Sequence, residues 1–193
     1  MIRQPAVAGA FYPENKSELE KTIAFFINMI DEKELLSEKL EEAKAFVAPH
    51  AGYIYSGYVA AYTYLALSKV LAKRRVDTIV VIGPNHMGLG DFVNISLADW
   101  QTPLGIAKND TELSQEIVSQ NEMFSTNEEE IADEHSVEVQ IPFIQYVSKG
   151  VSQNPKFCFI CMTDQSKEAS EIVGKAILKA SEKLKREIVV VAS

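Results

Sequence analysis

Two hydrophobic periodicities alternate along this chain. Short, nearly continuous apolar runs bounded by glycine, proline or charged residues are typical of buried strands. These runs occupy residues 44–48, 77–82, 92–97, 157–162 and 187–192. Between them, apolar residues recur every three or four positions, which is the spacing of one face of a helix. This second pattern predicts helices over about 17–30, 58–73, 110–119 and 164–184.

Three of these helices carry start signals. Ser17 and Glu20 form a capping box ahead of the first helix, in which each side chain satisfies a free backbone amide. Asp110 is placed to cap the third helix, and Asp164 or Ser166 to open the last one. The last helix is amphipathic, and its apolar side comprises Ile172, Val173, Ile177, Ala180 and Leu184.

Two segments are less regular. Residues 31–42 are rich in charge and are interpreted as a solvated helix or loop. Residues 137–147 have helical spacing, but Pro142 lies inside them and is expected to kink the helix or end it early, because proline lacks an amide donor.

Strands that alternate with helices predict an α/β protein, with a mostly parallel or mixed sheet between helices in a three-layer α/β/α sandwich. The unbroken apolar runs at 78–82 and 188–191 fit strands that are buried on both faces. At 193 residues one domain over 1–193 is expected. The last run ends at Ser193, where the strand should release a loop onto the functional edge. We therefore expect this domain to be truncated at its C-terminus.

Composition narrows the functional classes. The formal net charge is −8, which argues against a nucleic acid or an anionic membrane as partner. The sequence contains no uninterrupted apolar stretch of about 18 residues, so no membrane-spanning helix is predicted. Two cysteines and the absence of an apolar signal segment predict a cytoplasmic protein.

The candidate chemistry lies in three histidine motifs, Pro-His-Ala-Gly-Tyr at 49–53, Gly-Pro-Asn-His at 83–86 and Glu-His-Ser-Val-Glu-Val-Gln at 134–140. His50 and His86 each follow a predicted strand, one strand-helix-strand unit apart. Open α/β sheets build their sites at such strand ends. Imidazole is a common metal ligand and a common general base near neutral pH, so we interpret His50 and His86 as metal ligands. A plain turn with a histidine bonded to a nearby carbonyl is the alternative for each.

Two histidines do not complete a metal site, which usually has at least three protein ligands. Asp91, Glu134 and Glu138 are the candidates for a further ligand. His135, next to Glu134 and one helical turn before Glu138, is interpreted as an acid/base group whose ring Glu138 could orient. A histidine that merely pairs with its own glutamates near a helix start is the alternative.

Other polar or reactive residues are candidates for binding or for packing. Tyr53 and Tyr55, with Tyr58, crowd the turn after His50; they could bind an aromatic or phosphorylated group or simply pack a loop. Cys158 and Cys161 are spaced like a redox pair, but they lie in a predicted strand. Residues three apart in a strand face opposite sides, so we expect two core cysteines without a disulfide.

Four ordered motifs together resemble the Memo family over nearly the whole chain: Arg-Gln-Pro-Ala-Val-Ala-Gly-Ala-Phe-Tyr-Pro at 3–13, Pro-His-Ala-Gly-Tyr-Ile-Tyr-Ser-Gly at 49–57, Gly-Pro-Asn-His at 83–86, and Glu-His-Ser-Val-Glu-Val-Gln-Ile-Pro-Phe at 134–143. The resemblance implies a fold like that of class III extradiol dioxygenases, which hold non-haem iron with two histidines and a carboxylate. By this likeness His50 and His86 match the two histidine ligands, and His135 a third pocket histidine.

The resemblance implies iron or copper as the cofactor, and a small molecule or peptide as ligand. It also implies a radical-SAM protein as a partner in prokaryotic members. The leading hypothesis is therefore a metal pocket with redox or oxygen chemistry. The alternatives are a binding module for a phosphorylated or aromatic peptide or ligand in the same pocket, and a metal-dependent hydrolase. Tyr53, Tyr55, Asn85, Glu134 and Glu138 are the predicted binding residues around the histidines.

Overall fold

A six-stranded mixed sheet forms the centre of the protein in the computed structural model, which describes residues 1–35, 40–90, 92–151 and 154–193. The strand order is β2-β9-β3-β8-β4-β7. The strands are β2 (Ala45–Val47), β3 (Thr78–Pro84), β4 (Val93–Ile95), β7 (Phe124–Ser125), β8 (Lys156–Met162) and β9 (Ile188–Ala192). All five predicted strands are therefore present, and β7 is an addition.

Strand β3 organises the sheet because it pairs in parallel with β8 on one side and with β9 on the other. Strand β2 adds to β9, also in parallel. Strand β4 runs antiparallel to β8, which makes the sheet mixed. The continuous apolar run at 79–81 is fully buried, as expected for a central strand that is covered on both faces.

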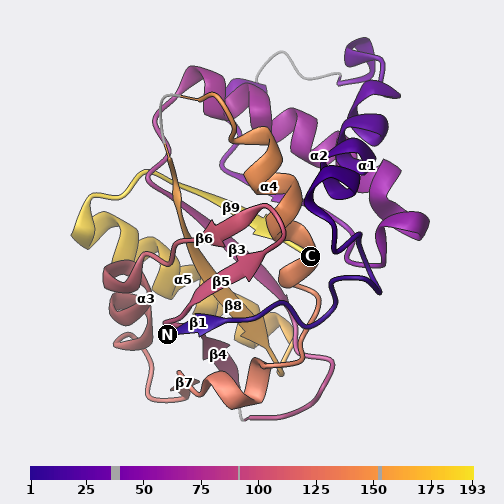
Figure 1. The fold of residues 1–193 in the computed structure, drawn as a ribbon. Coiled ribbons are helices and arrows are strands. Elements are labelled where there is room, and N and C mark those ends of the chain that lie inside the picture. Colours follow the sequence, from indigo (N-terminus) through magenta and orange to yellow (C-terminus); the bar gives the residue numbers. More distant parts are fainter. Residues whose placement is uncertain (36–39, 91, 152–153) are drawn as a thin grey trace.

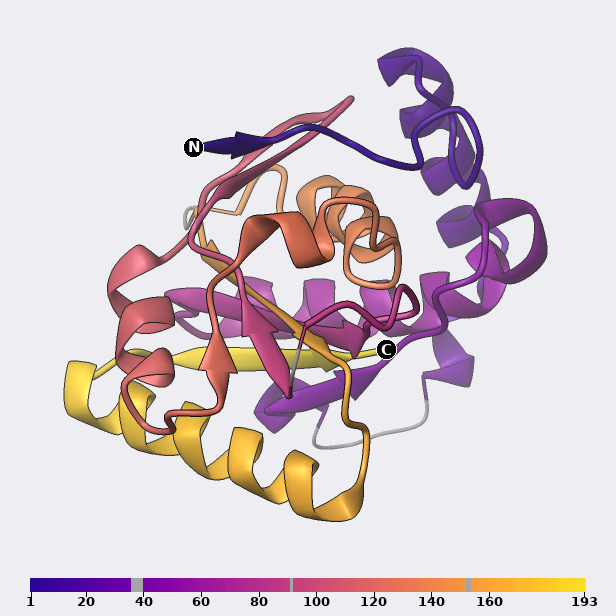
Figure 2. The same cartoon turned by 90° about the horizontal axis from the view of Figure 1, so that it is seen from below.

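Helices cover the two faces of the sheet as separate layers (Figures 1 and 2). One face packs against α1 (Lys16–Asn28), α2 (Tyr53–Lys73) and α4 (Ile141–Val147). The other packs against α3 (Thr111–Val118) and α5 (Lys167–Leu184). The three-layer α/β/α architecture predicted from the sequence is thus confirmed. No helix of the described residues is long and apolar enough to cross a membrane.

A small second sheet was not predicted. It consists of β1 (Ile2–Arg3), β5 (Asp99–Thr102) and β6 (Gly105–Ala107), in the order β1-β5-β6. It packs through Trp100, which is fully buried and stacks on Phe159 of β8. Its strands are two to four residues long, too short for a periodicity to be recognised.

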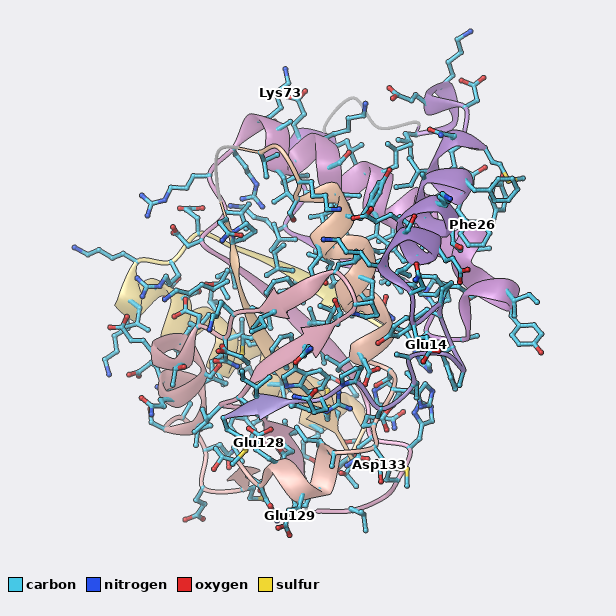
Figure 3. All side chains as sticks on the ribbon, viewed as in Figure 1. Glu14, Phe26, Lys73, Glu128, Glu129 and Asp133 are labelled. Atoms are coloured by element: carbon cyan, nitrogen blue, oxygen red, sulfur yellow. The ribbon has the colours of Figure 1, made fainter. Side chains whose placement is uncertain are left out.

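Four helix starts differ from expectation. Helix α1 begins at Lys16, and Asn15, not Ser17, caps it by accepting the amides of Ser17 and Glu18. Helix α2 begins at Tyr53, so the predicted tyrosine turn is its first turn. Helix α1 packs against α2 at Gly57, because a Cβ atom at Gly57 would collide with the ring of Phe26. Figure 3 labels Phe26 on α1.

The other two corrections concern Pro142 and Asp110. A 3₁₀ turn over Glu138–Gln140 leads into α4, so Pro142 falls in the first turn of that helix, where no amide donor is needed. Asp110 does not cap α3 with its side chain. Its carboxylate instead accepts hydrogen bonds from Thr78 and Arg186, and these bonds hold the Asp110 side chain in a buried position.

The two cysteines are free and buried, as predicted. Cys161 packs with the α1, α2 and α4 layer and Cys158 with the α3 and α5 layer. Burial raises the pKa of both thiols, which fits inert core residues. The 3₁₀ segments Glu32–Glu34 and Leu40–Glu42 flank residues 36–39, so the predicted solvated segment 31–42 lies partly outside the described residues.

The N-terminal segment is tied to the body of the protein by one buried carboxylate. Glu138 accepts hydrogen bonds from the Arg3 guanidinium at 2.7 Å, from the Tyr12 hydroxyl at 2.7 Å, and from the amides of Ala6 and Val7. Arg3 also donates to the Glu134 carbonyl and stacks over Trp100. Both Arg3 and Glu138 are buried, so each charge depends on the other for compensation.

We expect Arg3→Ala to lower the free energy of unfolding by about 3–5 kcal/mol, because it leaves the carboxylate of Glu138 buried without its cation. Urea denaturation monitored by circular dichroism measures this. Lys44→Ala is the control, since Lys44 and Glu187 form an exposed ion pair at 3.8 Å that should contribute less than about 1 kcal/mol. Equal small losses in the two variants would contradict the anchoring role of Arg3.

Candidate functional site

Three histidines gather where the parallel strands β2, β9 and β3 end. His50 follows β2 after a proline, and His86 follows β3. Because β2 and β3 both pair in parallel with β9, their carboxyl ends meet at one edge of the sheet. His135 reaches the same place from the segment between the 3₁₀ helix Glu128–Ile131 and the turn before α4.

The three imidazole rings contact one another. The ring centroids of His50 and His86 are 5.1 Å apart, and those of His86 and His135 are 4.4 Å apart. The third separation, between His50 and His135, is 5.9 Å. The expectation that His50 and His86 lie at one place is confirmed, and two rings this close can reach one ion with bonds of about 2.1 Å.

The tautomers of His50 and His86 follow from their partners. The Ser193 hydroxyl donates its only proton to the Ala48 carbonyl at 2.7 Å, so His50 Nδ1 must donate to Ser193 Oγ, 3.0 Å away. His86 Nδ1 lies 3.0 Å from a carboxylate oxygen of Glu134, and a carboxylate only accepts. Each ring therefore donates from Nδ1, which leaves Nε2 as the nitrogen that neither Ser193 nor Glu134 engages. Neither Nε2 has a hydrogen-bond partner among the described residues.

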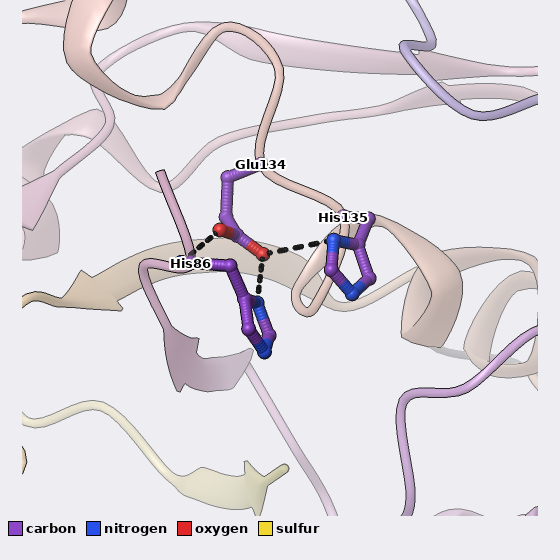
Figure 4. A group of neighbouring side chains, drawn as sticks. All are labelled: His86, Glu134 and His135. Atoms are coloured by element: carbon purple, nitrogen blue, oxygen red, sulfur yellow. Dashed lines mark hydrogen bonds and ion pairs between the residues drawn. The ribbon is translucent and has the colours of Figure 1, made fainter. Parts of the chain in front are cut away.

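Glu134 holds this arrangement in place (Figure 4). It is fully buried and accepts the backbone amides of His86 and Ser136 as well as the His86 ring. Its Oε1 atom also lies 3.5 Å from His135 Nδ1. In Figure 4 the rings of His86 and His135 extend from the carboxylate to the same side.

A glycine allows this close approach. A Cβ atom at Gly83 would collide with the side chain of Ser136, whose hydroxyl donates to the Pro84 carbonyl at 2.7 Å. The first residue of the Gly-Pro-Asn-His motif therefore lets the 134–136 segment pack against the end of β3.

The protonation states suit metal binding. Burial lowers the pKa of His50, and the nearby His86 and His135 act in the same direction. Burial also lowers the pKa of His135, against the opposing effect of the Glu134 charge. Burial acts to raise the pKa of Glu134, but hydrogen bonds from Ser136 and His86 outweigh it, and the net shift is downward. His50 and His135 are thus neutral, and Glu134 ionised, at neutral pH.

The tightest group of ligand-type atoms among the described residues belongs to His86, Glu134 and His135, within 4.8 Å of one another. We assign Glu134 an orienting role instead of a ligand role, because its oxygens already accept two amides and an imidazole. A carboxylate that orients a histidine is the usual neighbour of a metal-bound imidazole. Asp91, the other acidic candidate, lies outside the described residues.

The remaining predicted binding residues have their hydrogen bonds or their exposed surface outside the histidine cluster. Tyr53 is buried and its hydroxyl donates to the Val139 carbonyl, whereas Tyr55 is 85% exposed on α2. Asn85 is buried and secures its own loop through Leu89 and Met87. Glu138 faces Arg3 and the N-terminal segment, so the expectation that it orients the His135 ring is corrected by its four other donors.

Two polar residues of the site were missed by the sequence reasoning. Gln140 donates to Ser193 Oγ, to the Pro49 carbonyl and to the Ser136 carbonyl. It thereby joins the histidine segments of β2 and of 134–140, with Ser193 as the junction. Gln140 is part of the Glu-His-Ser-Val-Glu-Val-Gln motif, which is the signal that could have indicated it.

An apolar cavity of about 470 Å³ opens beside His50, between the sheet and α5. Its walls include Ile82, Val173, Ile177 and Val190, and no charged side chain of the described residues lines it. Gly174 also faces it, and a Cβ atom there would meet nothing within 4 Å. His50, and Ser193 to which it is hydrogen-bonded, line the cavity, so the cavity adjoins the histidine cluster.

The protein is an α/β/α sandwich, and its imidazoles gather at the carboxyl ends of parallel strands. These two features place it among α/β proteins with a candidate metal site. Residues 3–193 match the family described as Memo-like protein, and the chain belongs to that family.

MEMO1 family proteins of two archaea illustrate the similarity. The one from Pyrococcus abyssi is 40% identical over 194 residues, and the one from Sulfolobus acidocaldarius is 40% identical over 200 residues. All of this chain is matched in both cases. The chain spans 64% of the length of the Pyrococcus relative and 68% of the Sulfolobus one.

We expect His135→Ala to change the free energy of unfolding by less than about 1.5 kcal/mol, since the His135 side chain is partly exposed and its polar contact with Glu134 is 3.5 Å long. Glu134→Ala should cost about 1–3 kcal/mol, because it strips buried amides of their acceptor. Chemical denaturation of both variants tests the difference. A larger loss in His135→Ala than in Glu134→Ala would make His135 a structural residue.

Proposed function

We propose that the histidine cluster binds a redox-active metal ion, iron or copper, through Nε2 of His50 and His86. The observation that supports this most is the pair of fixed Nδ1 contacts on two rings whose centroids are 5.1 Å apart. Ser193 and Glu134 each accept a hydrogen bond from an Nδ1 atom, which leaves the two Nε2 atoms available to a shared ion. Such second contacts fix ring direction and raise ligand basicity in metalloproteins.

The remaining residues would work around the ion. His135 lies beside His86, is neutral, and can take up or release a proton at Nε2. Glu134 keeps both rings on the same side and stabilises positive charge that develops on them. Iron or copper, when bound, would supply electron transfer and oxygen activation at this position. Because the relatives are longer than this chain, any reaction of the whole protein, its cytoplasmic location and a radical-SAM partner stay predictions.

A second candidate function is a binding module, and the apolar cavity beside His50 favours it. The cavity has room for a small ligand. Its lack of charged walls favours a neutral aromatic or aliphatic group over a phosphorylated one, because phosphate binding generally uses Arg, Lys or clustered amides. The same cavity could hold the organic substrate of a metal-dependent reaction. Both candidate functions therefore call for a ligand with a neutral aromatic or aliphatic group. No observation favours a hydrolase.

Metal binding is tested by titrating the protein with Co²⁺, Cu²⁺ and, without oxygen, Fe²⁺ in a calorimeter. We expect His50→Gln and His86→Gln to abolish the tight phase. Glu134→Gln should weaken it about 10–100-fold, as removal of an orienting partner usually does. Glu129→Gln removes the same charge from an exposed position nearby and should change nothing. Wild-type protein without a tight phase, or histidine variants that bind as well as wild type, would refute the proposal.

Ligand binding is tested with the neutral fluorescent probe N-phenyl-1-naphthylamine. Gly174→Leu should fill the cavity and weaken probe binding at least tenfold. It should also stabilise α5 by up to about 1 kcal/mol, because leucine is a better helix former than glycine. Lys175→Leu adds the same side chain to the exposed face of α5 and should bind the probe like wild type. Identical probe affinities in the two variants would place the ligand elsewhere, and preferential binding of O-phosphotyrosine would contradict the neutral class.

A further inference from the structure

His135 differs from the other two histidines in how its ring is held. His50 and His86 each have an Nδ1 partner at 3.0 Å. The nearest acceptor of His135 Nδ1 is Glu134 Oε1 at 3.5 Å, beyond the usual range of a protein hydrogen bond. That oxygen already accepts the His86 ring and the Ser136 amide. Hydrogen bonding therefore does not fix the orientation of the His135 ring.

Packing takes its place. The His135 ring contacts two other rings closely, His86 at 4.4 Å between centroids with 20° between the planes, and Phe11 at 4.7 Å with 43°. His86 is itself fixed by Glu134. Phe11 is thus the contact that limits movement of the His135 ring away from the cluster, and aromatic pairs at this separation contribute more than their buried area alone.

Phe11 is rigidly presented although it belongs to a loop. Its amide donates to the Val7 carbonyl at 2.9 Å, and its carbonyl accepts the Tyr53 amide at the start of α2 at 2.7 Å. Gly9 has a φ of 84°, which gives the loop the left-handed turn that brings Phe11 back over the body of the protein. Gly52 packs directly against this residue, since a Cβ atom there would lie at contact distance, 3.4 Å, from the Phe11 carbonyl.

The base of the same loop is fixed by Glu138, which accepts the amides of Ala6 and Val7. The connection from the buried carboxylate to the histidine cluster is therefore continuous: Glu138 fixes Val7, Val7 fixes Phe11, and Phe11 packs on His135. Glu138 and His135 are three residues apart in sequence, yet they are linked through a segment more than 120 residues away.

From this we propose that Phe11 is the positioning residue of His135: its ring, held in place by the N-terminal segment, keeps the third imidazole in the cluster in place of a hydrogen bond. The inference deepens the proposed metal site and rests on it for its functional meaning. Its geometric content, however, concerns the protein without metal.

The first readout needs no metal. The chain has only three histidines, so the imidazole NMR spectrum contains three sets of signals, which His→Gln variants assign. In wild type we expect nuclear Overhauser contacts between the His86 and His135 rings. Phe11→Ala should lose at least half of this intensity and broaden the His135 signals, and Phe11→Tyr should retain both. Phe25→Ala removes a phenyl ring that is 61% exposed on α1 and should leave all three histidines unchanged.

The second readout is Co²⁺ affinity and the visible spectrum of the bound ion. Phe11→Ala should alter the spectrum and weaken binding severalfold, whereas Phe11→Tyr should match wild type. If Co²⁺ fails to bind wild type, the proposed function fails, but the contacts between the rings still decide the role of Phe11. Unchanged contacts between His86 and His135 in Phe11→Ala would overturn the inference. Should that variant not fold, Phe11→Leu, which keeps apolar bulk without a ring, is judged by the same contacts.

Discussion

The site depends on two buried carboxylates, those of Glu134 and Glu138, which lie on either side of a three-residue stretch. A carboxylate out of contact with water is costly unless donors surround it. Glu134 recruits its donors from the end of β3 and from its own turn. Glu138 recruits them from the N-terminal segment. The segment between the two acids therefore cannot pack without gathering distant parts of the chain, and His135 is carried into the cluster by that requirement.

The site is consequently assembled from the ends of separate strands and from one short segment, residues 134–138. The parallel ladder through β9 brings His50 and His86 to one edge, and the acidic segment closes over them. Gln140 and Ser193 join the two arrangements by a short hydrogen-bond chain that ends at His50. Burial in this packing lowers the pKa of His50 and of His135, and so favours their uncharged rings. Geometry and protonation of these two histidines thus have one common cause.

Much of the architecture could be predicted because long elements carry strong periodicity. The five main strands and the long helix α5 are recognisable from apolar spacing alone. The β1-β5-β6 sheet is not, since two to four residues show no period. The start of α2 is missed because Gly52 and the tyrosines look like a turn, whereas tertiary packing of Tyr53 makes them helical. At Asn15 and Ser17, two good capping residues compete, and the backbone selects the earlier one.

The candidate site was predictable to the level of its histidines but not of their supports. Motif density singles out His50, His86 and His135, and strand topology predicts that the first two meet. The orienting part played by Glu134 depends on its depth of burial, and that of Phe11 on a loop folding back from the N-terminus. Helical spacing suggested that Glu138 faces His135. In the fold, however, the 3₁₀ helix begins at Glu138 and His135 lies before it, so helical spacing does not relate the two side chains, and Glu138 pairs with Arg3 instead.

The pairing of β3 with β9 determines how far apart His50 and His86 lie. Residues 78–82 lie opposite 188–192 in strict register, and a strand advances by about 3.3 Å per residue with alternating faces. A slip of one residue would displace His86 from His50 by more than the length of a metal–nitrogen bond, and would turn the intervening side chains to the wrong layer. The register of the backbone ladder thus sets the spacing of the two imidazoles. Its smallest possible shift, one residue, is larger than the displacement that a metal site tolerates. Apolar residues of the two strands that do not touch the imidazoles through any hydrogen bond or ring contact, such as Val80 and Val190, therefore set the dimensions of the cluster.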